Sequence, residues 1–306
     1  MHRHAINMPI LLPAMLLSAT LIVTSALPSR LPLRPLKEIL RPDQLINGDS
    51  RFSFCHACMP TECGRVRSPT GILPRIYGGT AAPRGRHPWI AIVSDAQNNL
   101  IGSGVLISCN LALTTAFNVQ KVPHPSLLRI RLGAANVNER QDGELEFQVK
   151  QVFLHPEWNP QQSLHANDIA VLQLDGSVDF EQTNGYIAPI CLPAEDRNYT
   201  GWLTVAGFGQ NLYGTNQGEL RETDIFQLPG KDCAMFFDQP YTFCGLGNNK
   251  GLCNGDRGSP AVQAESDGRF SLAALANDFQ CWAGGSDVYT ATSHFVNWIC
   301  SVSVLP

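Results

Sequence analysis

The sequence of 306 residues carries little charge: Asp, Glu, Lys and Arg make up 16% of it, and the net charge is -4. Binding to nucleic acid or to an anionic membrane generally needs a concentrated basic surface, so this balance argues against both functions. Beyond the first 26 residues no apolar run approaches the 18 residues of a membrane-spanning helix. Helical periodicity is also scarce, and only the end of the chain shows it, in the spacing of Phe295, Trp298 and Ile299.

Turn-forming residues and cysteines, by contrast, are frequent. The 26 glycines and 21 prolines exceed ordinary usage and are typical of many short strands joined by turns. A hydrophobic content of 44% indicates a globular chain rather than a disordered one. Ten cysteines are too many for an ordinary reduced cytosolic protein of this length, so they favour an oxidising compartment.

Residues 1–26 have the features of a secretory signal peptide. A short basic start precedes an apolar run over residues 8–23, and Thr24, Ser25 and Ala26 form a small-residue cleavage site. We therefore expect a secreted, extracellular protein whose mature chain begins near Leu27.

Residues 27–75 differ in charge from the rest of the chain. They hold 8 basic and 4 acidic residues, a net charge of +4, whereas residues 76–306 hold 13 basic and 22 acidic residues, a net charge of -9. We interpret the first segment, which contains Cys55, Cys58 and Cys63, as a flexible basic leader. It is either a solvated linker or a segment that lies on its own acidic domain.

The segment 76–306 has the pattern of a β protein. Residues 89–93 and 104–107 are apolar runs on either side of a turn at Asn98 and Asn99, which predicts a hairpin. Residues 144–149 alternate between polar and apolar side chains, as a half-buried strand does. The pattern predicts one all-β domain of 231 residues, built as two barrels or sandwiches.

Four motifs stand out in and just before this domain, in chain order: Arg-Ile-Tyr-Gly-Gly at residues 75–79, Leu-Thr-Thr-Ala-Phe-Asn at 113–118, Asn-Asp-Ile-Ala-Val-Leu at 167–172 and Cys-Asn-Gly-Asp-Arg-Gly-Ser-Pro at 253–260. They resemble, in the same order, motifs of trypsin-like serine proteases. The resemblance implies two packed six-stranded Greek-key antiparallel barrels with a C-terminal helix, and a site between the barrels.

The family's catalytic positions depart from its pattern here. Catalysis by a serine protease needs a hydroxyl nucleophile, an imidazole that takes its proton and a carboxylate that orients the imidazole. By resemblance, Phe117 stands at the imidazole position and Arg257 at the nucleophile position, and only Asp168 is retained. Because loss of one triad member costs about 10⁴- to 10⁶-fold in rate, we expect no peptidase activity.

Three other residues are alternatives for the missing groups. Ser259 lies two positions after Arg257, where a hydroxyl would be misplaced relative to the oxyanion donors. His124 and His165 are the nearest spare histidines. We favour a structural role for Ser259 and expect neither histidine to act as a base.

The resemblance also implies a substrate pocket that has changed, at Gly251, Asn277, Asp278, Phe279 and Asp287. Gly251 lacks the carboxylate that trypsin has at the base of its pocket. Phe279 replaces a glycine and is expected to narrow the pocket mouth. Asp287 is either a receptor for a basic side chain or the partner of a local donor such as Arg257, and we favour the second interpretation. We expect Arg257 to fill the cleft and to pair with Asp287 or Asp168; a guanidinium that points into solvent is the alternative.

The activation apparatus of the family is better retained. Cleavage after Arg75 would free the ammonium group of Ile76, which by resemblance pairs with Asp256. A buried charge is tolerated only when it is paired, so the retained pair favours a cleavage, by a trypsin-like protease, that still has a function. Inheritance without use is the alternative.

The expected cysteine pairing rests largely on the resemblance. It implies three disulfides: Cys63–Cys191, Cys233–Cys244 and Cys253–Cys281. Cys109 and Cys300 are expected to pair with each other, and Cys55 and Cys58 to form a local or an intermolecular bridge. Two bonds of the family are missing as whole pairs, and Gly102 and Asn118 stand where one of them would be.

We therefore expect a secreted, catalytically inactive serine protease homologue, of the insect type, that acts by binding. It would be a cofactor or decoy in an extracellular protease cascade of the immune melanisation or clotting type. Its expected partners are extracellular proteins, including proteases or zymogens of the cascade and an activating trypsin-like protease, with no nucleic acid, membrane, cofactor or metal. Asn198, in Asn-Tyr-Thr, is a predicted glycosylation site. An active endopeptidase with an unusual site, and a structural or adhesive extracellular protein, are the alternatives.

Overall fold

The structure is a computed structural model, and it describes residues 62–66, 80–159, 161, 166–210, 218–228, 241–247, 251–279, 281 and 285–303. By its internal contacts the chain divides into residues 1–47 and residues 48–306, and all the described residues belong to the second unit. The predicted signal peptide, most of the leader and the cleavage site at Arg75 and Ile76 lie outside the described residues.

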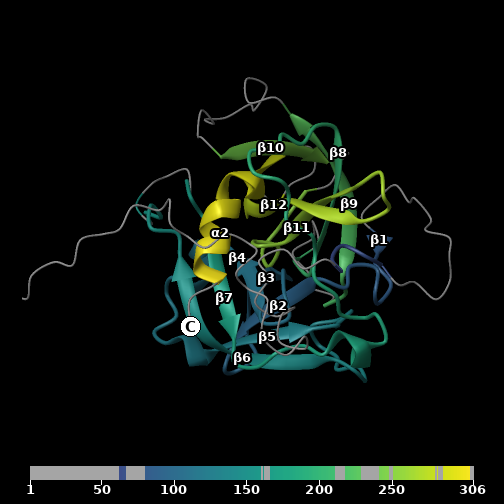
Figure 1. The fold of residues 1–306 in the computed structure, drawn as a ribbon, viewed down its shortest axis with the longest axis vertical. Coiled ribbons are helices and arrows are strands. Elements are labelled where there is room, and N and C mark those ends of the chain that lie inside the picture. The colour runs from purple at the N-terminus through teal and green to yellow at the C-terminus, as the bar shows by residue number, and fades with distance from the viewer. Residues whose placement is uncertain are drawn as a thin grey trace, which may run out of the picture. The chain divides into compact units, whose positions relative to one another are not determined.

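The first barrel closes six antiparallel strands in the order β2-β3-β4-β7-β6-β5 (Figure 1). The strands are β2 (Ile90–Asp95), β3 (Leu100–Leu106), β4 (Leu111–Thr114), β5 (Leu128–Leu132), β6 (Leu145–Leu154) and β7 (Ala170–Leu174). The predicted hairpin is β2–β3, and its turn includes Asn98 at a φ of 65°, a left-handed conformation that asparagine tolerates.

The second barrel follows the same plan. Its strands are β8 (Trp202–Gly207), β9 (Arg221–Leu228), β10 (Thr242–Gly247), β11 (Pro260–Ala264), β12 (Phe270–Asp278) and β13 (Ser286–Ala291). They follow the order β9-β10-β13-β12-β11-β8, and pairing between β8 and β9 closes the barrel. The short strand β1 (Thr80–Ala81) pairs with β9 as well.

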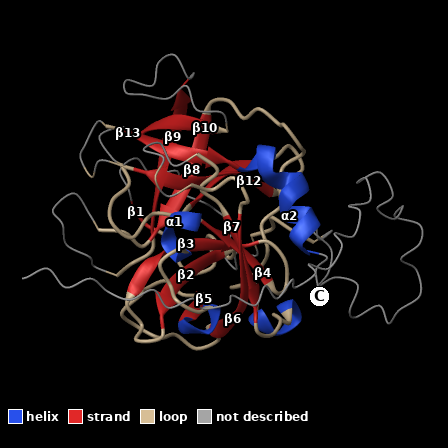
Figure 2. Cartoon of the chain, turned by 90° about the vertical axis from the view of Figure 1, so that its left-hand side faces the viewer, coloured by secondary structure: helices blue, strands red, loops and turns tan. Residues whose placement is uncertain are grey.

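Helices are few and short in the part of the chain that the structure describes. They are α1 (Ala116–Val119), α2 (Val296–Ser303) and three 3-10 turns at Pro125–Leu127, Phe180–Thr183 and Thr292–Phe295. Figure 2 shows strands throughout both barrels and α2 beside them. The predicted fold class, two six-stranded barrels with a C-terminal helix, is confirmed. None of the described helices is long and apolar enough to cross a membrane.

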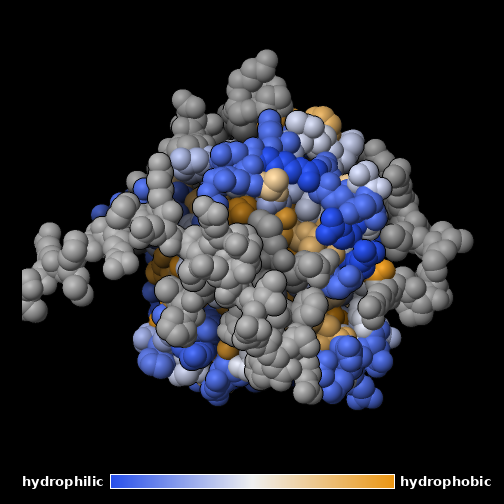
Figure 3. Space-filling view, in the orientation of Figure 1, coloured by the Kyte–Doolittle hydropathy of each residue, from blue (hydrophilic) through white to orange (hydrophobic). Residues whose placement is uncertain are grey.

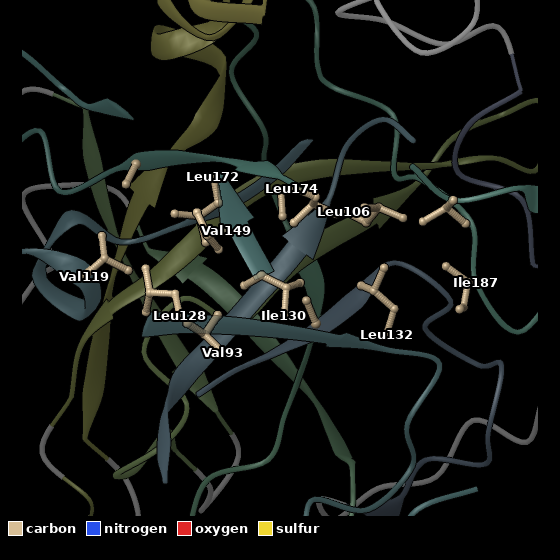
Figure 4. Close-up of a cluster of buried hydrophobic side chains, with 14 of the residues drawn as sticks. Val93, Leu106, Val119, Leu128, Ile130, Leu132, Val149, Leu172, Leu174 and Ile187 are labelled. Carbon is tan, nitrogen blue, oxygen red and sulfur yellow. The ribbon is translucent and has the colours of Figure 1, made fainter. Parts of the chain in front are cut away.

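Two of the buried hydrophobic clusters determine where the site lies. The first fills the interior of the first barrel, where alternate residues of β5, Leu128, Ile130 and Leu132, face Val93 and Leu172 (Figure 4). The second cluster joins the barrels to the end of the chain. It includes Trp89, Val105, Leu113, Ile169, Val262, Leu275, Phe295 and Ile299. Leu113 and Ile169, which belong to two of the motifs, lie in this second cluster. The two motifs therefore lie where the second barrel packs against the first.

Candidate functional site

Asp168 lies at the junction of the two barrels, two residues before β7. Its side chain is fully buried, and Oδ1 accepts the Phe117 N–H at 2.7 Å. From the second barrel, the Thr290 hydroxyl donates to its backbone carbonyl at 3.4 Å. Burial raises the pKa of the Asp168 carboxyl to about 7, although the Phe117 N–H and the Arg257 guanidinium both stabilise its charged form.

Arg257, in the loop before β11, directs its guanidinium toward this carboxylate. Nη1 lies 3.6 Å from Asp168 Oδ2, and Nη2 lies 3.1 Å from Asp278 Oδ1. Nη1 also donates to Asn277 Oδ1 at 3.2 Å. The arginine side chain is only 12% exposed. A single cation thus bridges carboxylates from the two barrels, and the ion pair with Asp278 was not foreseen from the sequence.

Two aromatic rings lie beside the same guanidinium. Its carbon is 4.2 Å from the centroid of the Phe117 ring and 5.6 Å from that of Phe279. Both distances fall within the range of a cation–π interaction. The residues that the resemblance places at the imidazole and nucleophile positions therefore contact each other. Phe117 as a whole residue is 37% exposed.

The backbone at residue 257 is held independently of its side chain. The carbonyl of Arg257 accepts the Ser103 N–H and the Asn118 side-chain amide, both at 2.9 Å. The next N–H, of Gly258, donates to the Ala276 carbonyl at 2.8 Å. Residue 257 is therefore fixed to β3 of the first barrel and to β12 of the second.

Asn118 lies against Gly102, and these are the two positions where the resemblance would place one of the absent disulfides. Its amide donates to Thr114 Oγ1 at 3.0 Å and lies directly over Gly102. A Cβ atom at Gly102 would meet Asn118 Nδ2 at 2.5 Å, so the amide fills the space that a larger residue would need. The sequence indicated that both cysteines were absent but gave no sign of this replacement contact.

Asp256, the predicted partner of a new N-terminus, lies in a backbone cradle. Its oxygens accept the Gly209 N–H at 2.7 Å and the Cys253 N–H at 3.0 Å. A Cβ at Gly207 or Gly209 would lie 2.2 or 2.3 Å from the carboxylate, so only glycine fits at these positions. Burial raises the pKa of Asp256 to about 6 despite the two donors. Ile76 lies outside the described residues.

Two of the five predicted pocket positions, Asn277 and Asp287, carry buried polar groups. Asp287 in β13 is buried, and its Oδ2 accepts the Leu252 N–H at 2.8 Å. The local donor is therefore a backbone group, whereas Arg257 lies against Asp168 and Asp278. Asn277 is fully buried and donates to Thr290 Oγ1 at 3.0 Å. Gly251 precedes Leu252 in the chain.

Of the alternative catalytic residues, Ser259 and His124 are not brought to this cluster. The buried Ser259 hydroxyl lies next to the Gly207 and Asp256 side of the second barrel, 2.4 Å from where a Cβ on Gly207 would be. His124 is in an exposed turn, where its Nδ1 contacts the Ser126 hydroxyl at 2.8 Å. His165 lies outside the described residues.

Disulfides hold the surrounding loops. The structure contains Cys63–Cys191, which ties the end of the leader to the domain, and Cys253–Cys281, which lies beside the pocket. Cys109, Cys244 and Cys300 are disulfide-bonded as well. Cys55, Cys58 and Cys233 lie outside the described residues.

Comparison with known proteins agrees with this architecture. The family model described as Trypsin matches residues 76–299, so the chain belongs to the trypsin family. Its relatives include rat vitamin K-dependent protein C, 30% identical over 74% of this chain and 51% of that protein. They also include Drosophila melanogaster serine protease filzig, 30% identical over 79% and 15%, and human atrial natriuretic peptide-converting enzyme, 28% identical over 83% and 25%. The chain thus spans about half or less of these relatives.

Proposed function

We propose that this protein is a secreted, catalytically inactive member of the trypsin family that acts by binding other extracellular proteins. The observation that carries the proposal is the Arg257 guanidinium, which lies between Asp168 and the Phe117 ring. A phenyl ring has no lone pair with which to take a proton, and a guanidinium has no hydroxyl. The group that would orient a catalytic imidazole instead pairs with a cation.

The same cluster offers a partner a mixed surface. Phe117 as a whole residue is 37% exposed, and the Asp278 side chain is 46% exposed beside the shielded Arg257. An aromatic ring next to a carboxylate suits a partner segment that combines an apolar and a basic side chain. Because the cleft of an active relative also receives peptide segments, this geometry supports the proposal of a decoy or cofactor role in a protease cascade.

Cleavage after Arg75 is the proposed switch for binding. Asp256 has two backbone donors but a pKa raised to about 6, so a cation that reached it would stabilise its charged form. The new ammonium group of Ile76 would be that cation. Because Cys63 is bonded to Cys191, the leader would stay attached after cleavage.

Chemical labelling tests the absence of catalysis. The protein, cleaved at Arg75, would be treated with a fluorophosphonate probe and with a mixed peptide library. We expect neither labelling nor cleavage. Stoichiometric labelling that disappears in Ser259→Ala would overturn the proposal in favour of an endopeptidase with an unusual site.

A cascade assay tests binding. Cleaved protein would be added to the extracellular fluid of its source, and trypsin-like activity would be followed with a chromogenic substrate. We expect a change in activity that Phe117→Ala and Asp278→Asn each reduce. Leu127→Ala, which truncates a similarly exposed residue of the first barrel, is the matched control. An unchanged activity in all samples would favour a structural or adhesive role.

A further inference from the structure

The outer face of the second barrel carries a row of exposed hydrophobic side chains. Trp202 of β8 is directly opposite Phe226 of β9, which is directly opposite Leu246 of β10. Their exposed fractions are 55%, 40% and 38%, and the two rings meet edge to face with centroids 5.3 Å apart. Figure 3 shows, on the face that it draws, separate hydrophobic areas among hydrophilic ones. Scattered exposed apolar residues are ordinary, but a continuous row indicates a surface that something covers.

The predicted glycosylation sequon leads directly into this row. Asn198 and Thr200 are exposed, Tyr199 between them is buried, and Trp202 is again exposed. Asn198 and Trp202 are four residues apart, so at about 3.3 Å per residue they are separated by at most about 13 Å. A branched oligosaccharide on Asn198 reaches past this distance.

The sequon is held so that Asn198 stays at the surface. The Tyr199 hydroxyl contacts Ser271 Oγ at 2.7 Å inside the barrel. Arg197 pairs with both oxygens of Glu265, at 2.6 and 2.9 Å, and its guanidinium lies 4.4 Å from the centroid of the Tyr199 ring. The neighbours on both sides of Asn198 are therefore anchored, and its own side chain is left accessible to an oligosaccharide transferase.

We propose that Asn198 carries an N-linked glycan whose first sugars pack against Trp202 and Phe226. The C–H face of a pyranose ring covers an aromatic ring and removes apolar area from water, while its hydroxyls stay hydrated. Thr204 and Asp224, hydrogen-bonded to each other at 2.8 Å next to the row, supply polar partners for those hydroxyls. The proposal rests on passage through the secretory pathway, which is part of the proposed function.

The test compares glycan forms of the full chain, secreted from eukaryotic cells behind a heterologous signal peptide. The intact glycoprotein is compared with protein trimmed by an endoglycosidase to one N-acetylglucosamine, and with Asn198→Gln and Thr200→Ala, which both remove the sequon. Mass spectrometry locates the glycan, and acrylamide quenching of tryptophan and binding of the dye ANS report exposure of the row. We expect quenching and dye binding to be lowest in the intact form and equally high in both sequon variants.

The Trp202→Ala variant separates a local effect from a global one. It retains the sequon, and we expect the quenching difference between its glycosylated and unglycosylated forms to be lost. An unmodified Asn198, or equal quenching in all the forms, would overturn the proposal. Dimerisation of the intact glycoprotein that Trp202→Asp abolishes would also overturn it, by assigning the row to a second copy. A heterologous signal peptide makes these results independent of whether the cleft is catalytic.

Discussion

Asp168 and Asp256 are both buried carboxylates with raised pKa values, but the protein holds them in different ways. Asp168 relies on the Phe117 N–H, with a smaller contribution from the Ala116 N–H, and on the side chain of Arg257. Asp256 relies on two backbone N–H groups in a cradle that only glycines allow. A side chain holds Asp168 in part, so a substitution can change its partners, whereas the backbone holds Asp256.

The largest expected effect comes from filling the cradle. Gly209→Ala places a Cβ 2.3 Å from Asp256 Oδ2, and relief requires the buried carboxylate to move. We expect the free energy of unfolding to fall by about 3 kcal/mol, at the upper end of the usual cost of overpacking. Denaturant unfolding measures the change.

Two further variants check the cause of that loss. Gly268→Ala adds a Cβ that meets no atom within 4 Å but sits at a φ of +80°, so it should cost only about 1 kcal/mol. Asp256→Ala combined with Gly209→Ala should cost less than the sum of the two single variants, because the clash is gone. A Gly209→Ala variant no less stable than Gly268→Ala would contradict the cradle.

An engineered disulfide tests the close contact between Gly102 and Asn118, beside the cleft that contains Asp168. A Cβ on Gly102 would lie 3.0 Å from Asn118 Cγ, and a disulfide places a Cβ about 3 Å from its partner's sulfur. Gly102→Cys combined with Asn118→Cys should form a bond. Because the new Cβ would also lie 2.7 Å from the Arg257 carbonyl oxygen, we expect a net stabilisation smaller than the roughly 3 kcal/mol of an unstrained bond. Peptide mapping and thermal unfolding measure both results, with Asn118→Ser as the control. Free thiols at both positions in the folded protein would count against the geometry.

The Asp168 pKa predicts a pH dependence. A carboxyl whose pKa rises on folding favours the folded state while protonated, so its contribution is present below about pH 4 and is lost as pH rises through about 7. Asp168→Asn keeps an acceptor for Phe117 N–H but cannot ionise, so it should be more stable than the natural protein at pH 8 and similar at pH 4. We expect the gap to widen between pH 4 and pH 8, by at most about 1.4 kcal/mol for each unit by which folding raises the pKa.

Unfolding at a series of pH values measures this gap. Arg257 and Asp278 are the other charged groups that act on Asp168, so Asp278→Asn is the control that leaves the carboxyl in place. Asp256 also has a raised pKa, but it is present in every variant, so its contribution to the free energy of unfolding cancels in the comparison. A gap that does not change between pH 4 and pH 8 would show that Asp168 does not titrate there.

The smallest expected effect is the contact between the Phe117 ring and the guanidinium. Phe117→Leu keeps an apolar side chain but removes the ring 4.2 Å from Arg257, and should cost about 1 kcal/mol at this partly exposed site. A double-mutant cycle with Arg257→Met isolates the pair. A coupling energy near zero would mean that the ring only fills space.

The sequence predicted the fold well because two independent signals agreed. Alternation over residues 144–149 and the turn at Asn98 and Asn99 indicate strands, and the four motifs fix the order of the barrels. The Cys63–Cys191 and Cys253–Cys281 bonds followed from the same resemblance and are present. These features depend on local pattern or on family-wide geometry, both of which a sequence carries.

The partners of the charged groups were harder to predict. A long arginine side chain reaches several carboxylates, and the sequence suggested Asp287 or Asp168 for Arg257 without pointing to Asp278. The choice depends on where the ring of Phe117 lies and on how β12 ends, which are properties of the packed barrels. The contact between Asn118 and the backbone at residue 257 depends in the same way on two segments that are distant in sequence.

The backbone at residue 257 has a consequence for protein engineering. Ser103 and Asn118 fix its carbonyl and Ala276 fixes the following N–H, and none of these bonds involves the arginine side chain. The position is therefore a preformed attachment point whose side chain can be exchanged without rebuilding the loop. A library of all residues at position 257, displayed on a stable two-barrel scaffold, should contain folded members with a wide range of cleft chemistries.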